Sequence, residues 1–226
     1  MTEQNGVWLS PSFVSLELTD ENKKEAIQWK NTLVNQNSYN SHLEQSFKNE
    51  KLTIKQQLVY LSGHSALQKT SITNTSGKTV TLFPSYHSTL FLNDLKLSKE
   101  DKTLKIVSAK STATGYIQFL NSTPEIEITN QGYKAQTEKL VLKPNETKEI
   151  VVSQTFIFSQ YSWKTENENI AKTAFNTLLN NTQKEKENQL VQLIARKKNI
   201  YKEAVYSNLI AKLLLTLQNN TRIAAE

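Results

Sequence analysis

The stretch that decides the fold is LTIKQQLVY, residues 52–60. Its apolar residues recur at even-numbered positions, so Leu52, Ile54, Leu58 and Tyr60 share one face of an extended chain. Thr53, Lys55 and Gln57 take the other face, as expected of a strand that is buried on one side and solvated on the other. We therefore predict a half-buried β-strand here.

A tight turn and further extended runs follow this strand. Residues 74–78 read NTSGK, in which Asn74 and Gly77 tolerate the positive backbone angles of a hairpin turn. The other segments with strand character are residues 66–73, 79–83, 88–92, 103–109, 115–120, 125–129, 139–142 and 149–158. So many short strands with no helical pattern between them favour an antiparallel β-sandwich over a parallel α/β sheet.

The N-terminal region is expected to mix strand and helix. Residues 7–18 predict a strand. A short helix capped by Thr19 or Asp20 is expected to continue to about residue 35. Its apolar side would consist of Ala26, Ile27, Trp29, Leu33 and Val34. The polar residues 35–49 are expected to form a loop.

The pattern becomes helical near residue 160. Apolar residues recur at helical spacing in residues 166–180, 184–197 and 200–217. All five glycines and all four prolines lie before residue 146, so the remainder contains neither helix breaker. We expect a β-sandwich domain over residues 1–160 and a helical segment over residues 161–226.

The last helix-like stretch, residues 208–225, is apolar on nearly every side. Such a helix needs neighbours all around it. It is too short for a membrane span, which takes roughly 20 apolar residues, so no membrane partner is expected. We interpret it as the first helix of a larger, truncated helical domain.

Composition narrows the range of partners. The charge of +6 comes from 27 basic and 21 acidic residues spread along the chain. Because they form no basic patch with interleaved aromatic residues, no nucleic-acid partner is expected.

The absence of cysteine excludes disulfides and thiolate metal sites. Residues 1–11 lack a secretory signal pattern, so we expect a cytoplasmic protein, or a periplasmic or secreted one whose signal was removed.

No catalytic residue, metal site or cofactor is expected in this chain. Ser65 lacks the second glycine of a nucleophile elbow and is expected in a turn. Glu125 and Glu127 share a strand face, where a solvated stripe is expected rather than the acid and base of a glycosidase. Neither a second histidine nor a carboxylate stands at metal-ligand spacing from the three histidines, His42, His64 and His87.

Flat aromatic rings can stack on sugar faces. The candidates for this role are Trp8, Trp29, Trp163, Tyr86 and Tyr116, although core packing is the commoner role of each. Phe156 and Phe158 are expected in the core. Trp8 is kept as a substrate-binding candidate.

The end of the chain resembles a known enzyme family. Residues 201–205, YKEAV, and 211–222, AKLLLTLQNNTR, resemble the opening of the catalytic domain in trehalase-like and family 63 glycoside hydrolases, also described as mannosylglycerate-hydrolase-like. In that family this helix begins an (α/α)6 barrel that follows a β-sandwich. Residues 58–60, 70–76 and 142–150 are similar to the sandwich.

The resemblance implies a fold and an activity. It implies a β-sandwich followed by helices that begin an (α/α)6 toroid, and a full-length enzyme that hydrolyses an α-linked sugar with inversion, through carboxylates beyond this chain. The chain alone is then inactive, and its partners are a carbohydrate and the missing barrel. Arg222 becomes a substrate-binding candidate, although Thr221 stands where the family has an aromatic residue. The alternatives are a carbohydrate-binding module, or a structural β-sandwich whose terminal helix docks into another chain.

Overall fold

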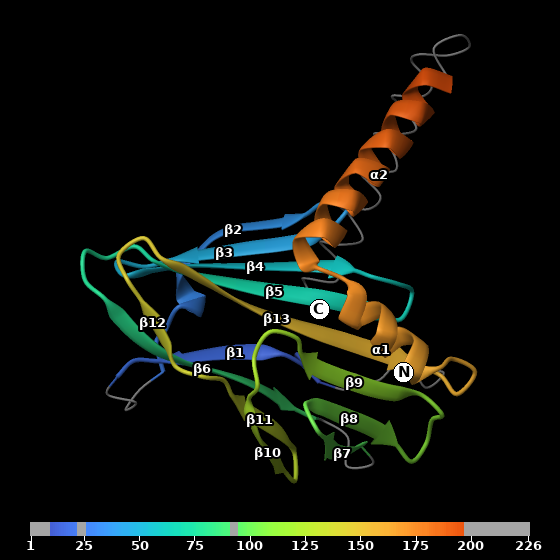
Figure 1. Cartoon of the computed structure of the whole chain (residues 1–226), viewed down its shortest axis with the longest axis horizontal. Helices are drawn as coiled ribbons and strands as arrows, with labels where there is room; N and C mark the ends of the chain where they lie inside the picture. The colour runs from blue at the N-terminus through green and yellow to red at the C-terminus, as the bar shows by residue number, and fades with distance from the viewer. Residues whose placement is uncertain (1–9, 22–25, 91–94, 197–226) are drawn as a thin grey trace. The chain divides into compact units, whose positions relative to one another are not determined.

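The computed structural model describes residues 10–21, 26–90 and 95–196 (Figure 1). Trp8, Arg222, the helix expected at residues 200–217 and the apolar stretch 208–225 lie outside these residues. The chain divides into two compact units, residues 1–179 and 180–226. The boundary expected near residue 160 stays a prediction.

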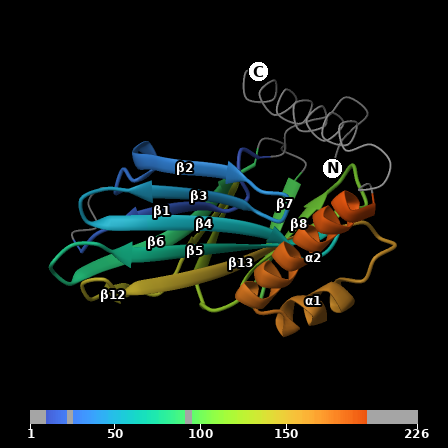
Figure 2. The same ribbon diagram turned by 90° about the horizontal axis from the view of Figure 1, so that it is seen from above.

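Two antiparallel sheets form the first unit. In the described residues the larger sheet has eight strands, in the order β2 (Leu33–Ser38), β3 (Leu43–Lys48), β4 (Leu52–Tyr60), β5 (Ser65–Asn74), β13 (Thr147–Ile157), β9 (Thr114–Phe119), β8 (Thr103–Ser108) and β7 (Leu95–Glu100). The smaller sheet has five, in which β6 (Val80–Thr89) pairs with β1 (Ser15–Thr19), β11 (Gly132–Gln136) and β12 (Leu140–Leu142), and β11 pairs with β10 (Glu125–Thr129). Figure 2 shows β2 to β5 and β13 side by side in one layer.

Strand β13 joins the two halves of the larger sheet. On one side it pairs with β5, from Thr147 opposite Thr73 to Thr155 opposite Ser65. On its other side it pairs with β9. Without β13 the sheet would consist of two separate groups, β2 to β5 and β7 to β9.

The core lies between the sheets. Alternate residues of both sheets point inward, including Ile54, Ile72 and Ile117 of the larger sheet and Leu16 and Tyr86 of the smaller one, all at most 1% exposed. Burial of such side chains is the main favourable term in folding. The predicted antiparallel β-sandwich followed by helices is confirmed.

The helix expected between Asp20 and residue 35 is wrong. Its place is taken by a short 3₁₀ turn, Lys30–Thr32, and by strand β2. Trp29, which suggested an apolar helix face, is buried in the core, with its ring edge-on to Phe47 at a centroid distance of 4.7 Å. Contact with the core therefore overrides the local helical pattern.

The loop expected at residues 35–49 is also wrong. Strands β2 and β3 occupy most of it and extend the larger sheet beyond β4. Strands β7 and β11 were not predicted either. In β2 nearly every side chain is exposed, so no alternation of apolar and polar residues marks it.

Strand β6 is continuous, although two shorter strands were expected there. The gap left between the two expected strands, at residues 84–87, does not occur. Pro84 lies between the part of β6 that pairs with β12 and the part that pairs with β11. A proline without an N–H is tolerated where the ladder changes partners.

The helices have different bounds from those expected. Helix α1 (Trp163–Lys172) starts at the Ser162 cap and ends at Thr173, whose backbone is extended. Helix α2 (Phe175–Arg196) then runs through the break expected after residue 180. No glycine or proline marks the real break, so the sequence carries no signal for it. Within residues 10–21, 26–90 and 95–196, no helix combines the length and the apolar character needed to span a membrane.

Candidate functional site

A group of hydroxyls around Glu166 fixes α1 to the outer face of the larger sheet. The Ser65 Oγ donates to Glu166 Oε2 at 2.8 Å and lies 2.8 Å from the Thr155 Oγ1. The Ser62 Oγ lies 3.3 Å from each carboxylate oxygen. Hydrogen bonds to an ionised acceptor are stronger than neutral ones. This group, which we call the Glu166 cluster, therefore ties the turn between β4 and β5 to α1.

An apolar cluster lies on the same outer face. Ile170 of α1 is 1% exposed and packs with Val59 and Leu67 of the sheet and with Phe175 and Leu179 of α2. Removing a side chain of this size from water stabilises the folded state by about 2 kcal/mol. The start of α2 is thus held to the sandwich together with α1.

Lys69 adds a polar contact to the start of α2. Its Nζ donates to the Asn176 Oδ1 at 2.7 Å and lies 3.0 Å from the Glu149 Oε1. It also lies 4.9 Å from the centroid of the Phe175 ring, within cation–π range. A buried lysine is tolerated here because its charge is paired.

The first turn of α1 stacks on β9. The Trp163 and Tyr116 rings are parallel, with centroids 3.9 Å apart and planes 3° apart. Burial, opposed by the charge of Lys105, raises the pKa of the Tyr116 hydroxyl. The Gln118 Nε2 donates to the Asn167 Oδ1 at 3.0 Å. The outer face thus holds α1 through hydrogen bonds to the Glu166 carboxylate, through the stacked rings of Trp163 and Tyr116, and through the hydrogen bond between Gln118 and Asn167.

Replacing Glu166 with alanine should lower the free energy of unfolding by about 2 kcal/mol, because the buried Ser65 hydroxyl loses its acceptor. Urea unfolding followed by circular dichroism measures this. Glu168→Ala is the matched control, since Glu168 lies on the same helix and is exposed. Equal effects of the two substitutions would show that the Glu166 cluster does not hold the helix.

The structure brings together two of the segments that carried the family resemblance. The fully buried Asn74, in residues 70–76, donates from Nδ2 to the Leu142 carbonyl at 2.9 Å. Its own carbonyl accepts the Asn145 N–H at 2.8 Å. Asn145 has a φ of 63°, a left-handed conformation that asparagine tolerates. Both segments therefore build one corner of the sandwich.

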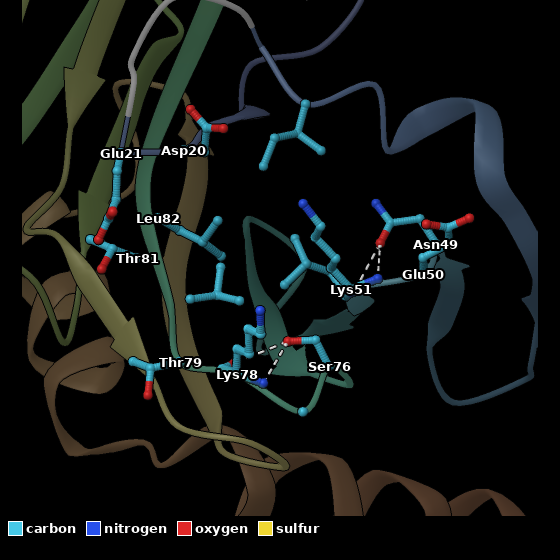
Figure 3. A pocket seen from close by; sticks show the side chains of 14 residues that line it. Asp20, Glu21, Asn49, Glu50, Lys51, Ser76, Lys78, Thr79, Thr81 and Leu82 are labelled. Carbon is cyan, nitrogen blue, oxygen red and sulfur yellow. Dashed lines mark hydrogen bonds between the residues drawn. The ribbon is translucent and has the colours of Figure 1, made fainter.

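A cleft of about 860 Å³ opens at the same end of the molecule (Figure 3). Its floor is apolar, with the half-buried Ile27 and Val80 packed against the core that contains Leu52 and Leu82. Its walls carry polar side chains from the segment after β1 and from the β3–β4 and β5–β6 turns. These are Asp20, Glu21, Asn49, Glu50, Lys51, Ser76 and Lys78. Sequence reasoning did not single out any of these as site residues.

The candidate aromatic rings do not form one sugar-binding platform. Trp29 and Tyr86 are core residues, at 3% and 0% exposure. Trp163 and Tyr116 stack on each other. Trp8 and Arg222 lie outside the described residues, so their substrate-binding roles stay predictions.

The expectation that Phe158 belongs to the core is wrong, because this residue is 46% exposed, and Phe156 is half-buried. Phe158 lies just after β13, where the chain leaves the sheet for the turn before α1. The strand alternation that predicted its burial therefore no longer applies to it.

The polar candidates lie on separate elements. Glu125 and Glu127 are exposed on β10, so the predicted solvated stripe is confirmed. Ser65 begins β5, and its hydroxyl belongs to the Glu166 cluster. His42 is buried, with its Nε2 3.6 Å from the Glu44 Oε2, while His64 packs against the Tyr161 ring.

No protein-family model and no curated protein matches the sequence. Solved structures do match. A protein assigned as a kojibiose phosphorylase, from the human microbiome, superposes with a TM-score of 0.59 at 14% identity, over 78% of this chain and 27% of that one. The likeness shows the fold. This chain thus spans about a quarter of that neighbour.

Two further neighbours are more distant. A protein assigned as an aldose 1-epimerase, from Escherichia coli K12, has a TM-score of 0.46 at 7% identity, over 56% of this chain and 68% of that one. A polysaccharide lyase has a TM-score of 0.45 at 9% identity, over 67% of this chain and 26% of that one. Neither likeness is close enough to bear on the fold.

Proposed function

We propose that this chain is the N-terminal, non-catalytic portion of a glycoside hydrolase that acts on α-linked sugars, with an (α/α)6 catalytic barrel following its helices. The observation that carries the proposal is the junction of sandwich and helices. Helix α1 starts soon after β13 ends and is fixed to the larger sheet through Glu166 and Ile170. A sandwich built this way holds the start of the helical segment that leads toward the proposed barrel.

Two similarities support the carbohydrate part of the proposal. The neighbour with the same fold is named as acting on kojibiose, a sugar. Residues 201–222 resemble the first barrel helix of trehalase-like and family 63 hydrolases. Because that neighbour is named as a phosphorylase, transfer of the sugar to phosphate is the second candidate reaction.

In the proposed enzyme the barrel supplies the chemistry. An inverting hydrolase needs a carboxylic acid that protonates the leaving oxygen and a carboxylate that activates water, about 6.5–9.5 Å apart. Glu44 is unsuited to the acid's role. Burial raises its pKa, but hydrogen bonds from Lys55, Gln57 and His42 and the charge of Lys55 outweigh burial and hold it below its ordinary value. A general acid needs the opposite shift.

The purified chain is expected to release no glucose from trehalose, kojibiose or an aryl α-glucoside above the buffer rate, with or without phosphate. The physical reason is that the acid and base come from the barrel. The same protein extended by the residues encoded after Glu226 is expected to turn over one of these sugars. Turnover by the 226-residue chain, or an extension that encodes no helical barrel, would contradict the proposal.

A further inference from the structure

We propose that the cleft between the β3–β4 and β5–β6 turns is a saccharide-binding site within the sandwich. The inference rests on the proposed function for the choice of an α-linked sugar. The existence of the site rests on the cleft itself. Its volume of about 860 Å³ falls in the range of about 300–1,000 Å³ that small-molecule sites occupy.

Two lysines line the cleft without a protein partner. In the part of the chain that the structure describes, the ammonium groups of Lys51 and Lys78 make no hydrogen bond or ion pair. Figure 3 shows both side chains directed into the space between the walls. An ammonium group carries three donors and no acceptor. The ammonium groups of Lys51 and Lys78 can therefore donate hydrogen bonds to a ligand in this cleft.

The backbones that carry these lysines are held in place. The Thr75 N–H donates to the Lys51 carbonyl at 2.9 Å, which ties the two turns together. The Asn49 Oδ1 accepts the Lys51 N–H at 2.9 Å, and the Ser76 Oγ accepts the Lys78 N–H at 3.4 Å. Pre-formed positions lower the ordering cost of binding.

The facing wall carries acceptors. Glu21 follows β1, and Figure 3 shows it across the space from Lys51. Ionised carboxylates only accept hydrogen bonds. With Glu50 at the rim, the lining contains charges of both signs, so an ion of either sign would meet like charge on one side. A neutral ligand rich in hydroxyl groups meets no such penalty, because a hydroxyl both donates and accepts.

The floor supplies the apolar contact that a sugar ring needs. Ile27 and Val80, both half-buried, present hydrocarbon at the base of the cleft, and they pack against the core that contains the buried Leu52 and Leu82. The C–H groups of a pyranose ring can cover such a surface, while its hydroxyls reach the two polar walls. Donor wall, acceptor wall and apolar floor together fit a saccharide.

The test is a titration of the ¹⁵N-labelled chain with maltotriose, followed by amide chemical shifts. Saturable shifts are expected at Lys51, Ser76, Gly77 and Lys78. Removing the Lys78 ammonium in Lys78→Met should raise the Kd about tenfold, the cost of one charge-assisted hydrogen bond, and Lys51→Met should do the same. The control is Lys96→Met, which removes an exposed lysine on β7 and should leave the Kd unchanged.

Three results would overturn the inference. They are no saturable shift at these residues, a Kd within twofold in the double variant Lys51→Met and Lys78→Met, or tighter binding of inorganic phosphate than of maltotriose. Circular dichroism spectra that match the parent chain show that the variants are folded. The glucose-release assay on the extended protein measures a different property, so binding can fail while the proposed function stands, and the reverse.

Discussion

Replacing Gly132 with alanine is expected to lower the free energy of unfolding by about 3 kcal/mol, the upper part of the range for overpacked sites. A Cβ at this position would overlap the carbonyl oxygen of Ser88 and lie 2.9 Å from its carbonyl carbon. Ser88 belongs to β6, which pairs with β11 at this point, so the obstacle is backbone and not a side chain that can turn away. Urea unfolding of both proteins measures the loss.

Gly63→Ala is the matched control for this substitution. No atom lies within 4 Å of a Cβ at Gly63, which is exposed in the β4–β5 turn. Its effect should stay within about 0.5 kcal/mol, as for other surface substitutions. If Gly132→Ala unfolds at the same urea concentration as the parent, the close approach of β11 to β6 is not real.

Replacing Ile170 with alanine is expected to cost about 3 kcal/mol and to loosen α1 from the sheet. The removed groups leave a cavity among Val59, Leu67 and Phe175, where the neighbours can relax only in part. Amide hydrogen exchange should therefore speed up in α1 more than in β4 or β5. The fluorescence of Trp163, which stacks on Tyr116, should change with it.

The control for Ile170→Ala is Ile128→Ala, the same chemical change at a residue that is 39% exposed on β10. It should cost less than about 1 kcal/mol, because little cavity is created. Equal costs at the two positions, or unchanged exchange in α1, would mean that the apolar cluster does not hold the helix. The junction on which the proposed function rests would then lose its support.

The strands could be predicted where one face is buried. In β4 the inward residues Leu52 and Ile54 are at most 2% exposed while Thr53 and Lys55 are half-buried, so the period of two holds in this half of the strand. It is wrong further on, because Gln57 is buried and Tyr60 is 65% exposed. Strand β2 carries no such record, because Asn35 and Gln36 are both exposed. Strand β2 forms because it pairs with β3, and the local sequence of β2 does not indicate this pairing.

The wrong helix has a related cause. The apolar spacing around Trp29 arises because that side chain enters the core, while Leu33 and Val34, which completed the apparent helical face, are 50% and 66% exposed. An amphipathic helix and an irregular segment with one buried aromatic ring can have the same spacing of apolar residues in the sequence. The two are distinguished only by the contact between Trp29 and Phe47, which is distant in the sequence.

The candidate site could not be read from the sequence at all. Lys51 and Lys78 sit in different turns, and they become neighbours because Leu52 pairs with Asn74 in the larger sheet. Lysines in turns are common, so neither position stands out by itself. Ser65 and Glu166, similarly, meet across 101 positions of sequence only after the sheet and α1 have formed.

The place of β13 in the larger sheet has a consequence for synthesis on the ribosome. The strand that occupies the middle of that sheet is the last of its strands to be made. Until Ile157 has emerged, the nascent polypeptide holds two unfinished half-sheets whose facing edges lack partners, the state in which strands pair wrongly. Cotranslational folding must therefore wait for nearly the whole domain, and a chain terminated before this strand should need chaperones and be degraded.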